Sequence, residues 1–371
     1  MTSDPTVSAP AETAPGRPDM AGPDTPFIHN AWYVIGTPSE VTRMPIARTV
    51  LGLSIVLFRT QAGRVIALRN RCCHRSFPLV HGALDGDTLV CGYHGLRFDC
   101  TGQCIEIPMQ KTVPTALRVA SFRVEERRDF VWIWMGDPAG ADAGALPLQD
   151  WMESPEWDTV HAYLHVPGSY VHLHENLLDL SHLSFLHAKA FGTPEYACAP
   201  AITRIEGDDI EVWRHVECIL PSVYSTPLGW TGMRARRSSG SKFVAPGLHV
   251  NTGIFENLDE PERSRNPTPT VKVGQIISPE TRHTTHYWTI VARNFARGDT
   301  QMAGFMLSQF LAAFSEDVFA LKAISDITRL EGDPGFREIS IPTDRAGVTM
   351  RRRLRALADL EQPAPDPTPR S

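Results

Sequence analysis

Short apolar runs separated by turn residues predict a β-sheet domain in the first part of the chain. The runs are rich in β-branched and aromatic residues, and Ala62-Gly63 separates two of them. Runs of about four to eight such residues, bounded by turn residues, are typical of strands in hairpins. We expect strands at 31–34, 53–58, 65–68 and 131–135, the last of which closes the domain.

The second part of the chain predicts helices together with an antiparallel sheet. Helices are expected at about 171–186, 300–330 and 345–360, and Gly332 provides a stop for the long one. Several strands are expected between about 201 and 290. A region of strands combined with separate helices favours an α+β fold.

A stretch rich in glycine, alanine and proline, from 138 to 147, predicts a domain boundary between the two patterns. We expect an all-β domain at 27–140 and a second domain at 148–360. Residues 1–26 are expected to be disordered, because their Pro, Ala, Thr, Ser and Asp content buries too little apolar surface. The Pro-rich residues 361–371 are expected to form a flexible tail.

Composition and charge exclude some partners. The chain has 371 residues, of which 42% are hydrophobic and 21% charged, with a formal net charge of −6. No basic excess points to nucleic acid or an anionic membrane, and no run of about 18 apolar residues predicts a membrane span. The Arg-rich runs at 234–237 and 351–353 are interpreted as solvated faces. Clustered cysteines and the lack of a signal-peptide core predict that the protein resides in the reducing cytoplasm.

Two cysteines and two histidines form the first candidate metal site. Cys72 and His74 make a C-x-H pair, and Cys91 and His94 follow as C-x-x-H. Zinc accepts such a ligand set. A Rieske [2Fe–2S] cluster needs the same set, with two Cys on one iron and two His on the other. The pattern alone leaves both possibilities open.

A carboxylate and two histidines inside a predicted apolar helix form the second candidate site. Asp179 and His182 are three residues apart and share a helix face. His182 and His187 are five apart, about 140° around a regular helix, so both reach one metal only if the helix bends or ends between them. A 2-His-1-carboxylate iron site also needs a further carboxylate. The candidates on the predicted long helix are Glu316, Asp317 and Asp326.

Together the two sites resemble those of the Rieske non-haem iron oxygenases, particularly the compact group of vanillate and dicamba O-demethylases. The resemblance extends from about residue 27 to 329, and the order and spacing of its motifs are specific. It implies an all-β Rieske domain followed by a helix-grip catalytic domain. The motifs are F-I-H-N-A-W-Y-V, C-x-H-R, C-x-Y-H-G-L, D-F-V-W-I-W-M-G-D-P, N-L-L-D-L-S-H-x4-H and S-E-D.

The resemblance assigns ligands to the Rieske cluster. Cys72 and Cys91 match the ligands of the inner iron, and His74 and His94 match those of the outer iron, where electrons leave. Cys73 stands where proline is common and is a rival thiol near the cluster, but the C-x-H spacing favours Cys72. The other cysteines, Cys100, Cys104, Cys198 and Cys218, are not expected to bind the cluster.

The resemblance also implies the residues of a mononuclear iron centre. His182, His187 and Asp317 match its ligands, with Glu316 as the alternative to Asp317. Asp179 matches a catalytic carboxylate that links a cluster histidine of one subunit to an iron histidine of its neighbour in a head-to-tail homotrimer. Three further sets complete the expectations: Asn176 near the iron, His172 and His174 as structural histidines, and His249 and His286 as polar groups in an apolar cavity for a neutral or weakly anionic aromatic substrate.

The implied activity is that of the oxygenase component of a multicomponent monooxygenase, with one [2Fe–2S] cluster and one mononuclear Fe(II) per chain. NAD(P)H electrons would arrive through a separate ferredoxin or reductase, because the chain has no G-x-G-x-x-G motif. The expected reaction is O-demethylation or N-dealkylation of an aromatic compound, xenobiotics included, with release of an aldehyde. The alternatives are ring hydroxylation by a dioxygenase and an electron-transfer or zinc protein without oxygenase activity.

Overall fold

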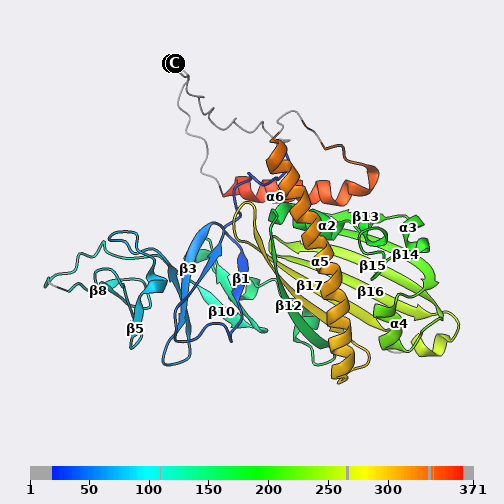
Figure 1. Ribbon diagram of the computed structural model, residues 1–371, viewed down its shortest axis with the longest axis horizontal. Coiled ribbons are helices and arrows are strands. Elements are labelled where there is room, and N and C mark those ends of the chain that lie inside the picture. Colours follow the sequence, from blue (N-terminus) through cyan, green and yellow to red (C-terminus); the bar gives the residue numbers. More distant parts are fainter. Residues whose placement is uncertain (1–18, 109, 265–266, 333–335, 337, 362–371) are drawn as a thin grey trace, which may run out of the picture.

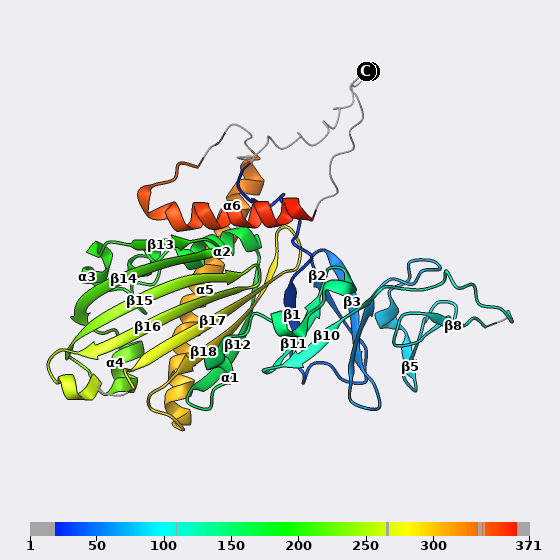
Figure 2. The ribbon, with the colours of Figure 1, turned by 180° about the vertical axis from the view of Figure 1, so that it is seen from behind.

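The computed structural model describes residues 19–108, 110–264, 267–332, 336 and 338–361. The chain forms two parts that lie side by side, a smaller one made of strands and a larger one in which helices cover a broad sheet (Figure 1). The view from behind shows the same arrangement (Figure 2). The expected α+β class, with the β domain first, is confirmed.

The smaller part contains antiparallel sheets with the strand orders β1-β11-β10, β2-β3-β4-β9 and β5-β6-β7-β8. The last of these lies farthest from the larger part (Figure 1). The strands are β1 (Trp32–Gly36), β2 (Ile46–Val50), β3 (Leu53–Arg59), β4 (Val65–Arg69), β5 (Ala83–Asp85), β6 (Thr88–Val90), β7 (Arg97–Phe98), β8 (Cys104–Glu106), β9 (Ser121–Phe122), β10 (Val124–Arg127) and β11 (Phe130–Trp134).

Strands β1 and β11 are buried along their whole length because their sheet lies between two cores. Trp32 and Trp132 pack in a cluster that includes Trp288 of the larger part. Tyr33 and Ile133 point to the other face and pack in the core of the smaller part. Strands that are covered on both faces show continuous apolar runs, as these do. The two parts of the chain therefore share a hydrophobic core.

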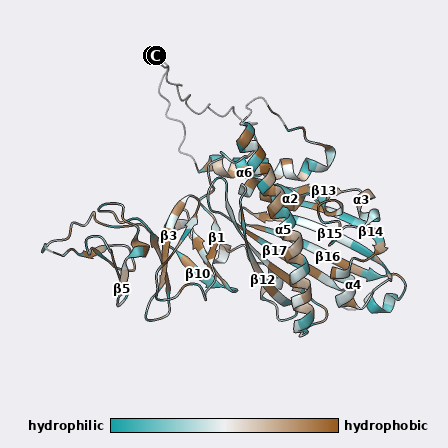
Figure 3. Ribbon diagram, in the orientation of Figure 1, coloured by the Kyte–Doolittle hydropathy of each residue, from teal (hydrophilic) through white to brown (hydrophobic). Residues whose placement is uncertain are grey.

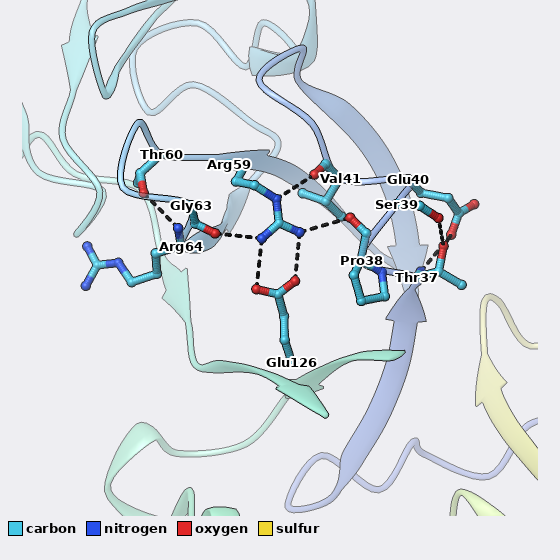
Figure 4. A network of polar contacts seen from close by, with 10 residues as sticks. All are labelled: Thr37, Pro38, Ser39, Glu40, Val41, Arg59, Thr60, Gly63, Arg64 and Glu126. Atoms are coloured by element: carbon cyan, nitrogen blue, oxygen red, sulfur yellow. Dashed lines mark hydrogen bonds and ion pairs between the residues drawn. The ribbon is translucent and has the colours of Figure 1, made fainter. Parts of the chain in front are cut away.

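Arg59 ties the edge of the smaller part together (Figure 4). Its guanidinium donates to both carboxylate oxygens of Glu126 on β10, at 2.9 and 2.7 Å, and to the carbonyls of Pro38, Val41 and Gly63. A fork-shaped guanidinium suits such bidentate pairing. The contact fixes the end of β3 against the first sheet.

The larger part is built on an antiparallel sheet with the strand order β12-β18-β17-β16-β15-β14-β13. Helices α2, α3, α4 and α5 contact this sheet or one another, and α6 packs on α2, β13 and β14. The elements are β12 (Asp158–Val166), β13 (Ile202–Glu206), β14 (Asp209–Ile219), β15 (Arg234–Ala245), β16 (Leu248–Asn257), β17 (Thr270–Pro279), β18 (Thr285–Arg293), α1 (Asp150–Glu153), α2 (Tyr170–Leu178), α3 (Pro194–Cys198), α4 (Ser222–Leu228), α5 (Thr300–Glu331) and α6 (Arg345–Leu360).

Helix α5 crosses the sheet and carries the predicted carboxylates. Its buried residues recur every three or four positions, and Phe314, Asp317 and Leu321 share the buried face. Among the described residues, only α5 is long and apolar enough to cross a membrane by length and composition. Apolar and polar residues are mixed along it (Figure 3), and it packs on β12 as a core helix does.

Helix α2 is shorter than the predicted helix at 171–186. It ends at Leu178, because Asp179 has an extended backbone and its side chain accepts from the backbone N–H and the hydroxyl of Ser181, at 2.7 and 2.5 Å. Side chains of Asp that bond to the following backbone commonly end helices in this way. His182 then begins a short 3-10 turn, His182–Ser184. The break that two iron-binding histidines require therefore lies at 179–181.

Residues 19–26 do not follow the disorder expected for 1–26. Ala21 is fully buried, and its N–H donates to the carbonyl of Arg351 on α6 at 2.9 Å. The Arg351 side chain donates to the carbonyl of Ala21 at 2.8 Å and lies 3.4 Å from Glu175, so it is no solvated charge. Glu361, expected in the tail, caps the N–H groups of His29 and Asn30. Residues 1–18 and 362–371 lie outside the described residues.

Candidate active site

Three side chains from distant segments converge on one point under α5. The donor atoms of His182, His187 and Asp317 all lie within 4.8 Å of one another. The Nε2 atoms of His187 and His182 face the same carboxylate oxygen of Asp317, at 3.0 and 3.5 Å. His187 and Asp317 are buried. Two imidazoles and one carboxylate are the donor set that non-haem Fe(II) takes in facial-triad sites, and a cation there offsets the cost of burying the carboxylate.

The other candidate carboxylates on α5 occupy different positions. Glu316 accepts from Nδ1 of His187 at 2.7 Å, behind the ring, and so orients the imidazole from outside the site. Asp326 pairs with Lys322 and Arg329 on the surface of the helix. Asp317 alone among the three faces both histidines.

Asn176 and Asp179 flank the iron site. Asn176 on α2 donates from Nδ2 to Asp317 at 3.0 Å and so fixes the carboxylate. Asp179 lies 3.5 Å from Nδ1 of His182. Burial raises the pKa of Asp179, but contacts with His182 and Ser181 outweigh it and lower this pKa to about 2, which keeps the carboxylate ionised. Asp179 also lines a surface hollow, so it connects the iron site with the outside of the chain.

The cluster loops follow β4 and β6 in the smaller part. Cys72 and Cys91 are buried, whereas His74 and His94 are exposed and their ring centroids lie 4.6 Å apart. Burial and the neighbouring Cys91 raise the pKa of Cys72 to about 11, so a bound cation is needed to hold the Cys72 sulfur as a thiolate. Cys73 is exposed, unlike Cys72 and Cys91. All seven cysteines are free of disulfides, and the residues present fit a [2Fe–2S] cluster.

A mostly apolar cavity opens beside the iron ligands, between α5 and the sheet. Its walls include Leu177, Leu183, Phe191, Phe310 and Phe314. Its polar lining, apart from the iron-site residues and Tyr224 on α4, comes from the sheet: Arg237, Ser239, Asn251, Thr252 and Gln275. A cavity with an apolar wall and few polar groups is typical of a site for a small organic molecule.

His249 and His286, expected to contact substrate, do not line this cavity. His249 shares a face of β16 with Asn251, but it lies nearer the strand start, where its Nε2 meets Nδ1 of His174 at 2.6 Å. His174 in turn bonds to the carbonyl of Pro246, as expected for a structural histidine. Burial lowers the pKa of His174 to about 4 and that of His249 well below its usual value, so the pair is neutral.

His286 lies where the two parts of the chain meet. Its Nδ1 and Nε2 bond to the hydroxyl of Tyr163, at 2.8 Å, and to the carbonyl of Thr49, at 3.0 Å. Both ring nitrogens are thus engaged in joining β18 to β12 and β2. Sequence alternation predicts which face of the sheet a side chain lies on. Its contacts also depend on its position along the strand, which the alternation does not give.

Arg237 and the other polar residues of the cavity are not predicted by the sequence pattern. Arg237 was interpreted as part of a solvated run, yet it is 1% exposed. Arg234 and Arg236 do lie on the outer face of β15, paired with Glu217. Residues two apart on a strand share a face, so Arg237 lies on the same face as Ser239, and Arg234 and Arg236 lie on the other. This alternation could have distinguished Arg237 from its two exposed neighbours.

Family comparisons match both parts of the chain. Residues 31–122 match the Rieske [2Fe-2S] domain, and residues 166–360 match the vanillate O-demethylase oxygenase C-terminal domain. The toluene-4-sulfonate monooxygenase system iron-sulfur subunit of Comamonas testosteroni is 35% identical over 339 residues, which are 88% of this chain and 96% of that protein. The oxygenase component of dicamba O-demethylase from Stenotrophomonas maltophilia is 33% identical, covering 90% of this chain and 99% of that protein.

A solved structure supports the same assignment. The crystal structure of dicamba monooxygenase bound to 3,6-dichlorosalicylic acid superimposes with a TM-score of 0.82 at 30% identity, covering 90% of this chain and 98% of that one. The domain order, the cluster loops and the 2-His-1-carboxylate site are thus accompanied by matches over most of the chain. The chain belongs to the Rieske non-haem iron oxygenases, as an oxygenase component with a Rieske domain and a vanillate O-demethylase-type catalytic domain.

Proposed function

We propose that this chain removes an alkyl group from an aromatic compound by oxidation, as O-demethylation or N-dealkylation, and releases an aldehyde. The observation that carries the proposal is the triad of His182, His187 and Asp317, the last two of them buried, at the edge of an apolar cavity. A carbon that is hydroxylated next to an oxygen or nitrogen loses that atom on collapse, which gives the aldehyde and a phenol or amine.

The residues of the chain have separate tasks in this reaction. The iron supplies dioxygen activation when bound, and the cluster supplies electrons one at a time. Asn176 and Glu316 hold Asp317 and His187 in place by the hydrogen bonds described above. The apolar wall binds the ring of the substrate and keeps water away from the iron ligands.

We further propose a head-to-tail homotrimer in which the cluster of one subunit serves the iron of its neighbour. Within one chain the cluster loops lie in the smaller part, beside the sheet β5-β6-β7-β8 that is farthest from the larger part, whereas the candidate iron site lies at α5 of the larger part (Figure 1). Asp179 faces a surface hollow, and His74 and His94 are exposed, so both ends of the path are open to another subunit. Large exposed apolar side chains lie on α5 and the segment after it, and such patches commonly mark interfaces. They are Phe319, Ile324, Ile327, Leu330, Phe336, Ile339 and Ile341.

In this proposal the protein works in the cytoplasm. Electrons from NAD(P)H reach the cluster through a separate ferredoxin or reductase. The names of the relatives, an iron-sulfur subunit and an oxygenase component, support a system of several proteins. Two other functions are the alternatives to dealkylation. Electron transfer alone leaves the buried triad and its cavity without a use, and ring hydroxylation uses the same site but yields a cis-diol.

Product analysis tests the proposal. The iron- and cluster-loaded protein is supplied with a surrogate reductase and offered methoxybenzoates, N-alkyl anilides and simple arenes. We expect an aldehyde and a dealkylated product from at least one alkylated compound, and none from a matched Asp317→Ala variant. A cis-diol as the only product, or equal aldehyde release by the variant, contradicts the proposal.

A further inference from the structure

We infer that Arg237 binds an anionic group of the substrate, a carboxylate or a sulfonate, in the cavity beside the candidate iron ligands. The inference rests on the proposed function, because it concerns the same cavity. It names the chemical class of substrate and the residue that selects it.

The guanidinium of Arg237 is a buried charge that the chain leaves without a counter-ion. Its side chain lines the cavity and forms an ion pair with no carboxylate of the described residues. The two carboxylates that also line the cavity are engaged elsewhere, Asp179 with Ser181 and Asp317 with His187. A buried charge is costly unless it is paired, so an anion that enters the cavity meets an unneutralised cation.

The guanidinium is also held in a fixed orientation. Nη1 donates to the carbonyl of Phe191 at 2.7 Å and Nε donates to the hydroxyl of Ser239 at 3.0 Å. Its Cζ lies 4.4 Å from the ring centroid of Tyr196 and 5.2 Å from that of Tyr224. Nη2 forms no hydrogen bond with the described residues. A guanidinium fixed by two bonds and two rings keeps its remaining N–H groups ready for the oxygens of one anion.

A row of aromatic rings leads from the candidate iron ligands to Arg237. The ring of the iron ligand His187 lies 5.8 Å from that of Phe191, which stacks on Tyr224 at 6.0 Å, and Tyr224 faces Arg237. An aromatic molecule lying along this row presents one end to the iron ligands and the other to the guanidinium. The group to be oxidised and the anionic group are then at opposite ends of the substrate.

Arg214 provides a matched comparison. It is also buried, on the neighbouring strand β14, where its Nη1 donates to the carbonyl of Tyr196 at 2.9 Å and its Cζ lies 5.5 Å from the Tyr196 ring. It does not line the cavity. Both arginines therefore support the segment around Tyr196, and only Arg237 reaches the substrate. If Arg237 had only a structural role, substituting Arg237 or Arg214 should change ligand binding to a similar extent.

Calorimetric titration of the iron- and cluster-loaded protein tests the inference without turnover. The probes are benzoate against benzamide and benzenesulfonate against benzenesulfonamide, pairs that differ in charge and little in shape. We expect at least one anion to bind about tenfold or more tightly than its neutral partner. Arg237→Gln should abolish this preference and leave the affinity of the neutral partner unchanged. Arg237→Lys should retain part of the preference, and Arg214→Gln all of it.

Several results overturn the inference. They are equal binding of anions and neutral partners by the unaltered protein, no binding of either anion, an anion preference that survives in Arg237→Gln, or the same loss in Arg214→Gln. The first two need no variant and so do not depend on its folding. Anion preference without aldehyde release contradicts the proposed dealkylation and leaves the role of Arg237 standing, whereas aldehyde release without anion preference contradicts only the role of Arg237.

Discussion

The cluster loops and the iron site both use two imidazoles, but they are built differently. The candidate cluster ligands all lie between Cys72 and His94, and the two histidines are exposed. The candidate iron ligands come from segments 130 residues apart, and His187 and Asp317 are buried, the latter on the inner face of α5. Exposed imidazoles let electrons pass to another molecule, whereas a buried triad excludes water and leaves room for a substrate. The contrast separates an electron-delivering site from a substrate-transforming one.

Removing one ligand of the iron site should have the largest effect, because it should abolish one site and leave the other intact. Asp317→Ala should lose the mononuclear iron, so that iron falls from about three to about two per chain, and should lose all product formation, because two imidazoles alone do not make the triad. Metal and acid-labile sulfide analysis with visible spectra checks this. Asp326→Ala, on the exposed face of the same helix, is the control. Equal loss of cluster absorbance in Asp317→Ala would contradict the separation of the two sites.

Asp179 connects the two sites in the proposed trimer, so its charge should matter for electron delivery. Asp179→Asn should keep both metal centres and lower product formation by about 100-fold or more, the upper end for partners of metal ligands. The rate at which the pre-reduced cluster is oxidised is the measurement. Glu338→Gln removes a carboxylate from the same surface hollow and serves as the control. Near-normal oxygenation by Asp179→Asn would remove Asp179 from the path.

Glu316 should affect the iron site only through His187. Glu316→Ala removes the acceptor for Nδ1 and is expected to weaken iron binding by about 10- to 100-fold, with Glu316→Gln intermediate because its amide oxygen still accepts. Competition with a chelator measures the affinity, and the cluster spectrum should stay unchanged. Unaltered iron affinity in Glu316→Ala would show that the hydrogen bond does not position the ligand.

The smallest expected effect concerns the buried pair of His174 and His249, which belongs to neither site. Burial lowers both pKa values, so the unfolded chain takes up protons below about pH 6.5 while the folded pair stays neutral. Stability should therefore fall as the pH drops from about 6.5 towards 5. In His249→Gln the fall should be smaller by about 1 kcal/mol per pH unit, seen as a flatter dependence of Tm on pH. Parallel pH curves would show that His249 does not titrate on unfolding.

The same contrast explains what the sequence could predict. The cluster motif is local, so its four residues could be recognised together, and the long helix was expected at 300–330 and found at Thr300–Glu331. The histidines of the iron site depended on a break in the helix, which the side chain of Asp179 makes. Asp317 could have been separated from Glu316 by the face that it shares with Phe314 and Leu321.

The cavity depends on tertiary contacts that no local pattern contains. His249 lies on the same face of its strand as the cavity residue Asn251, but its ring bonds to His174. His286 bonds across the contact between the two parts of the chain. Arg237 was read with its neighbours as a surface charge, because a run of arginines hides the two-residue alternation of a strand. Strand register places Arg237 beside Val216 on the inner face of the sheet, and only the assembled fold shows what lies opposite.

The central claim is that the two metal sites serve one dealkylation, and a single-turnover measurement tests it most directly. The loaded protein is reduced chemically, freed of reductant, and mixed with dioxygen and an alkylated aromatic that yields an aldehyde. We predict that aldehyde appears together with the oxidation of the cluster, and that in Asp317→Ala the cluster stays reduced on this timescale and no aldehyde forms. Cluster oxidation at the same rate in both proteins, without a link to aldehyde, would contradict the account.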